Sequence, residues 1–286
     1  MPAACAEKAP AKINLTLRII GRRADGYHDI DSLVAFAGVG DILTFTTGRA
    51  MMLTVRGPTA AAAGEPAENL VLKAARALAE RIEGLTLGHF ALSKRLPVAA
   101  GLGGGSADAA AALRILARVN ALALDDPRVM QAARATGADV PVCLDPRTQR
   151  MRGVGEVLSE PLKLPRMPAV LVNSGVSLAT KDVFAALDPV AQPAQSTQPA
   201  RAAANLLDEI THGHNDLEAP AIELVPVIAD VLAVLRALAG CRLARMSGSG
   251  ASCFGLFDST QAAACAARRL RAGYPDWWVR ATTLGA

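Results

Sequence analysis

A glycine-dense segment at residues 97–107 carries the clearest chemical signal in this sequence of 286 residues. It reads Pro-Val-Ala-Ala-Gly-Leu-Gly-Gly-Gly-Ser-Ala and leads into an alanine-rich stretch typical of a helix. Glycine lets backbone N–H groups approach an anion, and the start of a helix adds unpaired N–H groups and a positive dipole end. The segment therefore predicts a loop that binds phosphate groups, with Ser106 as N-cap of the helix that follows.

Two common phosphate-binding patterns do not fit this segment. The pattern GxxxxGK[ST] is absent from the sequence, so no lysine is supplied to the phosphates from within the loop. The dinucleotide pattern GxGxxG also fails, because Ser106 stands where its third glycine belongs and no acidic residue follows at the required spacing. A purely structural glycine turn remains an alternative. The proline, the four glycines and the serine together favour phosphate binding.

Two charged residues far from the loop are candidates for chemistry. Lys12 lies beside Asn14 on the polar face of a predicted half-buried strand over residues 11–19. Asp139 lies in the segment Gly-Ala-Asp-Val-Pro, where the proline is expected to hold Val140 extended. Without further information, a solvated strand lysine and a structural turn aspartate are the simpler interpretations.

The composition limits the classes of protein that the chain can belong to. It is 51% hydrophobic and 20% charged, so it can bury a core and is not disordered. A net charge of +4 without a basic run, and only 3% aromatic residues, give no support for binding to nucleic acid or a membrane surface. We expect no nucleic-acid partner and no membrane partner, and the oligomeric state is left open.

The cysteines and the N-terminal residues indicate a cellular compartment. Five cysteines are scattered without a CxxC pair, so we expect reduced thiols rather than a disulfide framework. The N-terminal residues lack the basic and apolar regions of a signal peptide, and no window approaches eighteen apolar residues. These features predict a cytoplasmic protein.

Hydrophobic periodicity and turn residues predict a mixture of helices and strands without regular alternation, which favours an α+β fold. Helices are expected at residues 69–81, 106–119, 127–137, 177–187, 203–210, 219–239 and 260–272, and strands at 11–19, 30–38, 41–47, 51–55, 86–94, 169–173, 253–257 and 277–283. Residues 189–200 are rich in proline and glutamine and predict a surface loop. The pattern changes after Gly155, so we expect two domains, 1–155 and 156–286.

The sequence resembles the GHMP kinases, a superfamily that includes galactokinase and the homoserine and mevalonate kinases. The resemblance begins with the loop at residues 97–107. Four further segments occur in the same order as in one family of these kinases, at residues 9–15, 23–28, 137–141 and 246–251. That family uses ATP to phosphorylate the 2-hydroxyl of 4-diphosphocytidyl-2-C-methyl-D-erythritol in the non-mevalonate route to isoprenoids. The fold implied has an N-terminal domain like domain 2 of ribosomal protein S5 and a ferredoxin-like C-terminal domain.

The resemblance also implies roles for individual residues. Lys12 would stabilise the transferring phosphoryl group, and Asp139 would act as general base. ATP with Mg²⁺ would bind through Asn69 and the loop, whereas the ligands of the metal stay unknown. The loop residues are Pro97, Val98, Ala99, Ala100, Gly101, Leu102, Gly103, Gly104, Gly105, Ser106 and Ala107. Asn14, Tyr27, His28 and Thr180 would bind the substrate, with Tyr27 and His28 at its cytosine.

Three other interpretations compete with this one. A homoserine or mevalonate kinase would share the loop but would not need Tyr27 and His28 for a base. A non-catalytic nucleotide sensor would not need both Lys12 and Asp139. An RNA-binding protein of similar fold would require the basic patch that the sequence lacks. His212 and His214 lack further metal-binding residues at suitable spacing, which favours a surface turn.

Overall fold

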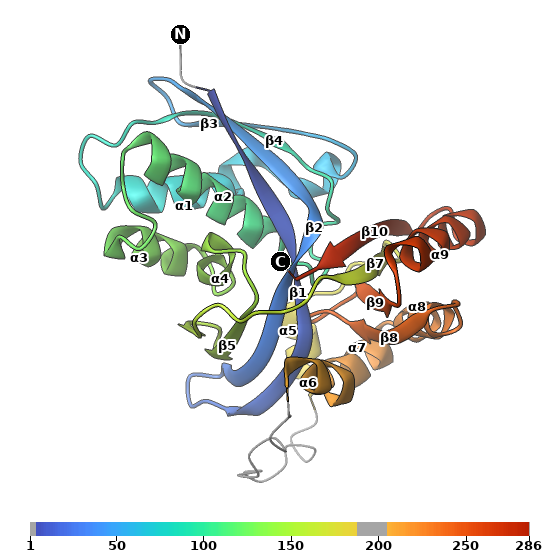
Figure 1. The fold of residues 1–286 in the computed structure, drawn as a ribbon. Helices are drawn as coiled ribbons and strands as arrows, with labels where there is room; N and C mark the ends of the chain where they lie inside the picture. The colour runs from blue at the N-terminus through green and yellow to red at the C-terminus, as the bar shows by residue number, and fades with distance from the viewer. Residues whose placement is uncertain (1–3, 188–204, 286) are drawn as a thin grey trace. The chain divides into compact units, whose positions relative to one another are not determined.

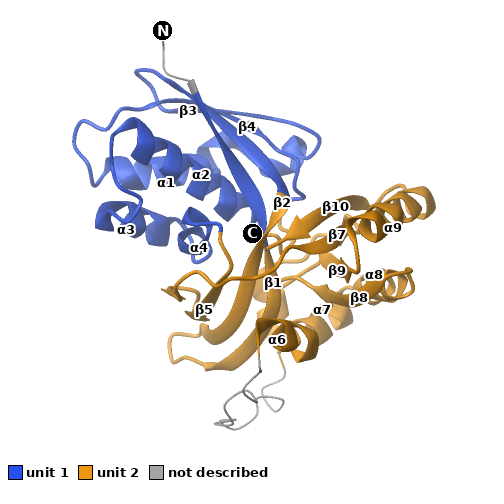
Figure 2. Ribbon diagram, in the orientation of Figure 1, with its two compact units in different colours: residues 1–12, 39–98, 103–146 blue, residues 13–38, 99–102, 147–286 orange. Residues whose placement is uncertain are grey.

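A computed structural model describes residues 4–187 and 205–285 and divides the chain into two compact units (Figure 2). Unit 1 comprises residues 1–12, 39–98 and 103–146, and unit 2 comprises 13–38, 99–102 and 147–286. Strands β1 (Ala4–Arg22) and β2 (His28–Thr47) contribute to both units and pair with each other (Figure 1). The domain boundary after residue 155 stays a prediction, and the segment 189–200 lies outside the described residues.

Unit 1 combines a small sheet with four helices. Strand β2 pairs antiparallel with β4 (Gly88–Ser93), and β4 pairs in parallel with β3 (Met52–Arg56). Two short 3-10 helices, η1 (Ala60–Ala63) and η2 (Pro66–Glu68), precede the helices. The helices α1 (Leu70–Ala79), α2 (Gly104–Val119), α3 (Pro127–Thr136) and α4 (Val140–Leu144) contact one another on one side of these strands (Figure 1).

Helix α2 is the buried centre of unit 1. Its alanines between residues 107 and 112 are fully buried, and the small side chains let neighbouring helices approach closely. A helix that is apolar on all sides needs burial on all sides, which this arrangement provides. The helix begins at Gly104 with Gly103 as N-cap, so the prediction that Ser106 caps it was wrong.

Three local predictions fail where tertiary packing or proline position decides the conformation. Val140 is helical rather than extended, because Pro141 lies in the first turn of α4, where its missing N–H has no helical partner to lose. The helix expected at 219–239 is divided before Pro226. The strand expected to be half-buried at 11–19 is buried on both faces over residues 11–17.

The C-terminal half of unit 2 has the strand order β10-β7-β9-β8. Its strands are β7 (Met167–Asn173), β8 (Cys241–Met246), β9 (Cys253–Phe257) and β10 (Trp278–Leu284). Helices α7 (Glu218–Leu224) and α8 (Val227–Arg236) separate β7 from β8, and α9 (Thr260–Gly273) separates β9 from β10. This split β-α-β order is ferredoxin-like, as the resemblance implies.

The other elements of unit 2 are short. Strand β5 (Gln149–Gly153) pairs with β2 and with β6 (Val157–Leu158). Helix α5 (Thr180–Ala185) begins at a predicted substrate residue, and α6 (Leu206–His212) precedes the His-Asn-Asp segment. The hydrophobic core of the unit collects side chains from β7, β8, β9, α8 and α9. The predicted α+β fold is confirmed.

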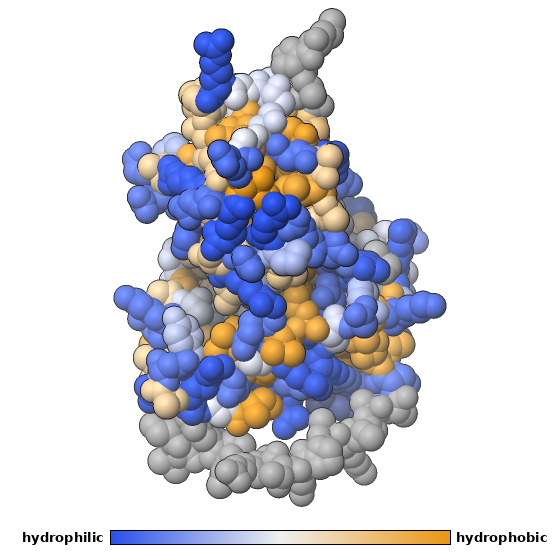
Figure 3. Space-filling view, turned by 90° about the vertical axis from the view of Figure 1, so that its left-hand side faces the viewer, coloured by the Kyte–Doolittle hydropathy of each residue, from blue (hydrophilic) through white to orange (hydrophobic). Residues whose placement is uncertain are grey.

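The surface of the described residues mixes polar and apolar groups. On the face drawn in Figure 3, hydrophobic side chains form separate groups among hydrophilic ones. We find no described helix with the length and apolar character needed to cross a membrane. All five cysteines are free thiols, and the cytoplasmic location stays a prediction.

Candidate active site

Lys12 and Asp139 meet in unit 1. The Lys12 Nζ lies 2.7 Å from the Asp139 Oδ2, and the two side chains are 5% and 38% exposed. Lys12 comes from β1, and Asp139 is the N-cap residue of α4, so the two elements place opposite charges in contact. A buried ammonium beside a half-exposed carboxylate leaves the carboxylate open to a ligand. The solvated strand lysine is thereby excluded.

The glycine loop lies directly against Lys12. A Cβ atom added to Gly103 would lie 3.0 Å from the Lys12 Cβ, and Gly103 has a φ of +59° that side chains rarely adopt. Both facts require glycine at this position. The loop residues 103–107 therefore bring the start of α2 to the same place as the lysine–aspartate pair.

A second ionic cluster lies beside the loop in unit 1. The Lys94 Nζ donates to the Asp41 Oδ2 at 2.5 Å and to the Asp108 Oδ2 at 2.7 Å, and all three residues are buried. Asp41 also accepts the backbone N–H groups of Arg95 and Leu96 through its Oδ1. These contacts connect β2, the end of β4 and the N-terminal part of α2.

The two carboxyl groups of this cluster are not equivalent. Burial raises the pKa of Asp108 to about 8, partly offset by Lys94, and the Asp108 Oδ1 is buried with no hydrogen-bond partner among the described residues. Asp41, in contrast, accepts three hydrogen bonds. Burial alone would lower the pKa of Lys94, but the neighbouring carboxyl groups raise it on balance. At neutral pH the cluster therefore holds one ion pair and a neutral Asp108.

Arg114 joins the two elements that supply Lys12 and Asp139. From the buried helix α2, its Nη1 donates to the Cys143 carbonyl at 2.6 Å and its Nη2 to the Lys8 carbonyl at 2.6 Å. Lys8 belongs to β1 and Cys143 to α4. Sequence analysis missed this residue, although an arginine within an alanine-rich buried helix is a signal that could have identified it.

In unit 2, the remaining loop residues 99–102 contact a second glycine turn at residues 247–251. The Ser247 Oγ donates to the Gly101 carbonyl at 2.9 Å, and the Ser252 N–H donates to the Ala100 carbonyl at 3.2 Å. The Ser247 Oγ also accepts the Asn14 backbone N–H at 3.1 Å. The turn therefore fixes one part of the phosphate loop and the backbone of a predicted substrate residue together.

Asn14 has an unused acceptor. Its Nδ2 donates to the Ser32 Oγ at 2.7 Å, but its Oδ1 is buried and has no partner among the described residues. A buried polar atom without a hydrogen bond is costly and is a common sign of a ligand contact. Thr180, at the start of α5, shares a hydrogen bond of 2.8 Å with Ser249 of the turn.

The predicted cytosine residues differ in their surroundings. Tyr27 is 66% exposed, whereas the ring of His28 lies 5.1 Å from the ring of Phe184 in α5, at an angle of 32°. Burial, followed by the charge of Arg22, lowers the pKa of His28, so the imidazole is neutral at pH 7. Phe184 was missed by sequence analysis. Its position four residues after Thr180 on a helix, in a chain with few aromatic residues, was the available signal.

Asn69 acts as a helix cap. Its side chain accepts the Val71 N–H at 3.0 Å at the start of α1, which is the structural role that its position allows. A contact with ATP stays a prediction. His214 pairs with Asp216 at 2.8 Å, and the described residues contain no group of three metal-binding side chains.

Comparison with protein families identifies the class. The model described as "GHMP kinases N terminal domain" matches residues 69–145, and the one described as "GHMP kinases C terminal" matches residues 197–276. The first match includes the phosphate loop and Asp139, and the second includes the turn at 247–251. These matches place the chain among the GHMP kinases, which are small-molecule kinases that use ATP.

Relatives define the family more narrowly. A 4-diphosphocytidyl-2-C-methyl-D-erythritol kinase from Xanthobacter autotrophicus is 58% identical, with 97% of this chain and 98% of the relative covered. One from Methylorubrum extorquens is 56% identical, with coverage of 97% and 98%. A crystal structure of 4-(cytidine 5'-diphospho)-2C-methyl-D-erythritol kinase has a TM-score of 0.83 and 36% identity, and covers 99% of this chain and 100% of its own. The chain therefore belongs to the 4-diphosphocytidyl-2-C-methyl-D-erythritol kinase family.

A homoserine kinase from Cytophaga hutchinsonii shares the fold at a TM-score of 0.72. Its sequence is 20% identical, with 100% of this chain and 96% of that chain covered.

Proposed function

We propose that this chain transfers the γ-phosphoryl group of ATP to the 2-hydroxyl of 4-diphosphocytidyl-2-C-methyl-D-erythritol, a step of isoprenoid biosynthesis by the non-mevalonate route. The observation that carries the proposal is the 2.7 Å contact of Lys12 with Asp139 beside Gly103 of the phosphate loop. It joins a cation, a partly exposed carboxylate and a phosphate-binding backbone, which are the groups that phosphoryl transfer to an alcohol requires.

Each group has a distinct task in the proposed reaction. A carboxylate oxygen of Asp139 accepts the proton of the attacking 2-hydroxyl. The ammonium of Lys12 stabilises negative charge on the transferring phosphoryl group. The 2-hydroxyl is a tertiary alcohol and a poor nucleophile, so its placement contributes more than proton removal. The buried side chain of Lys12 and the fixed α4 terminus suit that task because neither moves freely.

ATP is proposed to bind through the loop at residues 97–107, with Asn69 near the adenosine. Mg²⁺ is proposed to accompany the nucleotide. In the part of the chain that the structure describes, no three acidic, histidine or cysteine side chains form a metal site. The lack of such a group among these residues is compatible with a Mg²⁺ ion that binds with the nucleotide, because phosphate oxygens and water supply most of the ligands of that ion. When bound, the ion would neutralise charge on the phosphates.

The substrate end of the proposal uses unit 2. His28 and Phe184 supply a ring pair, and Tyr27 supplies an exposed aromatic face on which a cytosine can stack. A neutral His28 can both donate and accept a hydrogen bond, which suits the edge of the cytosine. The free Oδ1 of Asn14 is available to a hydroxyl of the substrate. The hydrogen bond between Thr180 and Ser249 supports a role for Thr180 in contacting the same molecule.

A substrate panel tests the proposal. The purified protein is supplied with ATP, Mg²⁺ and one acceptor at a time, and formation of ADP and of the phosphorylated acceptor are both measured. We expect turnover with 4-diphosphocytidyl-2-C-methyl-D-erythritol and none with homoserine or mevalonate. Turnover with either of the other acceptors alone would contradict the assignment. Nucleotide binding without any turnover would favour a sensor.

A further inference from the structure

The segment 213–218, here called the clamp segment, carries the His-Asn-Asp residues that the proposed reaction does not use. It follows α6 and lies against β1. The Leu17 N–H donates to the His214 carbonyl at 2.9 Å, and the Asp216 N–H donates to the Leu17 carbonyl at 2.9 Å. The Asp216 Oδ2 accepts the Ile19 N–H at 2.6 Å. The clamp segment is thus fixed along a strand of unit 2.

The clamp segment also forms hydrogen bonds with the end of β8. Asn215 is 5% exposed, and its Nδ2 donates to the Met246 carbonyl at 2.9 Å and to the Gly248 carbonyl at 2.8 Å. The Glu218 Oε2 accepts the Met246 N–H at 2.9 Å. Both polar groups of the Met246 backbone are therefore bound by this one segment, at the point where the turn at 247–251 begins.

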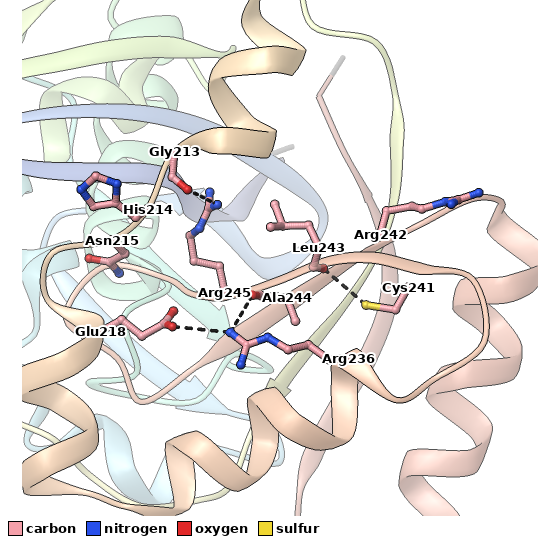
Figure 4. A pocket seen from close by; sticks show the side chains of 10 residues that line it. All are labelled: Gly213, His214, Asn215, Glu218, Arg236, Cys241, Arg242, Leu243, Ala244 and Arg245. Carbon is pink, nitrogen blue, oxygen red and sulfur yellow. Dashed lines mark hydrogen bonds and ion pairs between the residues drawn. The ribbon is translucent and has the colours of Figure 1, made fainter. Parts of the chain in front are cut away.

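Arg245 strengthens the same connection. It is buried, and its guanidinium donates to the carbonyls of Leu15, Ile210 and Gly213. Figure 4 shows this guanidinium pointing toward Gly213, with Asn215 and Glu218 on the same side of a pocket of about 520 Å³. The pocket leaves space beside the clamp segment. The clamp segment is therefore not enclosed by packing on every side, and its contact with the end of β8 depends on these hydrogen bonds.

We propose that Asn215 is a positioning residue for the kinase reaction, because its two hydrogen bonds fix the turn at 247–251 that holds Asn14, Gly101 and Thr180. The turn makes three contacts through which a displacement of its backbone would reach these residues. Ser247 accepts from the Asn14 backbone and donates to the Gly101 carbonyl, and Ser249 bonds Thr180. The inference rests on the proposed function, which gives those three residues their roles.

The variant Asn215→Asp tests the inference with little change in volume. The remaining oxygen still accepts the Leu217 N–H, which Asn215 Oδ1 accepts at 3.0 Å. The other atom becomes an oxygen that faces two carbonyl oxygens, so both donated bonds are lost. We expect kcat/KM to fall about 10- to 100-fold, because a small misplacement of reacting groups has an effect of this size. The dissociation constant of ATP should rise as well.

Asn120→Asp is the matched control. Asn120 also bridges backbone groups, donating to Leu116 at 2.8 Å and accepting the Thr86 N–H at 2.7 Å. It lies at the C-terminal end of α2, about 24 Å along the helix from the glycine loop. We expect this variant to lose stability without a change in KM or in ATP affinity. All variants are compared at a temperature well below their unfolding midpoints.

A double-mutant cycle separates positioning from general damage. If Asn215 acts through the turn, Ser247→Ala should reproduce part of the loss, and the variant carrying both changes should be no worse than Asn215→Asp alone. Additive losses, or an unchanged KM and ATP affinity in folded Asn215→Asp, would overturn the inference. If Asn215→Asp does not fold, Asn215→Ser, which keeps a short donor, is tested by the same criteria. ATP binding is measured without the acceptor, so it remains informative if the proposed acceptor is wrong.

Discussion

The two units bury different kinds of polar groups beside the glycine loop. Unit 1 buries charges: Lys12 contacts Asp139, and Lys94 contacts Asp41 and Asp108. In unit 2, the side chains bound to the turn at 247–251 are neutral asparagine, serine and threonine residues, together with backbone amides. The buried guanidinium of Arg245 in this unit donates to backbone carbonyls rather than to a carboxylate of the cluster. Both clusters contact a part of the same glycine loop. Unit 1 thus supplies charged groups beside the loop, and unit 2 supplies hydrogen bonds that fix the backbone of the loop.

The proposed function gives this difference a chemical reason. A transferring phosphoryl group carries negative charge, which buried cations can stabilise strongly in a low-dielectric site. A sugar-like alcohol and a cytosine are neutral, so hydrogen bonds of fixed direction recognise them better than charge. We therefore expect unit 1 to respond to loss of charge and unit 2 to respond to displacement of donors and acceptors.

The largest expected effect is on catalysis in unit 1. Asp139→Asn keeps the size of the side chain but removes the proposed base and the charge that contacts Lys12. We expect kcat to fall about 100- to 10,000-fold, with a small change in the KM of ATP. Steady-state kinetics with the cytidyl substrate measures this. Asp125→Asn, at an exposed acidic residue before α3, should leave kcat unchanged. A loss of only a few-fold in Asp139→Asn would show that Asp139 is not the base.

The next effect concerns stability of the charged cluster. Lys94→Met leaves two buried carboxyl groups without their cation, and breaking a buried pair in this way costs about 3–5 kcal/mol. Urea unfolding at neutral pH measures the change. Lys73→Met, at an exposed position of α1, is the control and should shift the free energy of unfolding by less than about 0.5 kcal/mol. Equal effects of the two substitutions would refute a structural role for the cluster.

A smaller effect is expected from geometry in unit 2. Gly101→Ala places a Cβ against the Ser247 carbonyl oxygen and requires a positive φ of 72°. Gly26→Ala also requires a positive φ, of 88°, but meets nothing within 4 Å. The second variant should lose about 1–2 kcal/mol from backbone strain alone, and the first should lose more. The difference between the unfolding free energies of the two variants measures the cost of the contact between the added Cβ of residue 101 and the turn at 247–251. Equal losses of unfolding free energy in the two variants would mean that the turn shifts to accommodate the added Cβ at little cost.

Sequence patterns found the elements and features that depend on neighbours along the chain. The helices expected at 69–81, 127–137 and 260–272 were predicted correctly to within two residues at each end, because each depends on residues close along the chain. The meeting of Lys12 with Asp139 was expected only through resemblance to a family. Nothing in their local sequence indicates a contact between residues so far apart.

The residues that were missed act across elements. Arg114 and Asn215 each satisfy backbone carbonyls that are distant in sequence, so their role depends on the assembled unit. The polar residues of β1 were assigned to a solvated face by their alternation. Burial on both faces overturned that assignment, since a polar strand residue can be buried once partners are supplied from elsewhere.

Per pH unit, the smallest predicted change in stability comes from a pH dependence in unit 1. The pKa of Asp108 is about 8 in the folded chain, above its usual 3.8, because burial disfavours the charged form. Between those two values the folded state holds one more proton than the unfolded state. The contribution of Asp108 to stability is therefore complete below pH 4 and falls by up to about 1.4 kcal/mol per pH unit until pH 8. Asp108→Asn should remove this slope.

Urea unfolding of both proteins at pH 5, 6, 7 and 8 makes the comparison. The difference between the two free energies of unfolding should be smallest toward acid pH, because below about pH 4 Asp108 is protonated in the unfolded state as well as in the folded state. The wild type should lose stability relative to the variant as the pH rises. Parallel curves would mean that Asp108 is ionised throughout, so that Lys94 is shared by two negative charges. A neutral Asp108 instead leaves one ion pair in the cluster. The Asp108 Oδ1 is then an uncharged hydrogen-bonding group beside the phosphate loop.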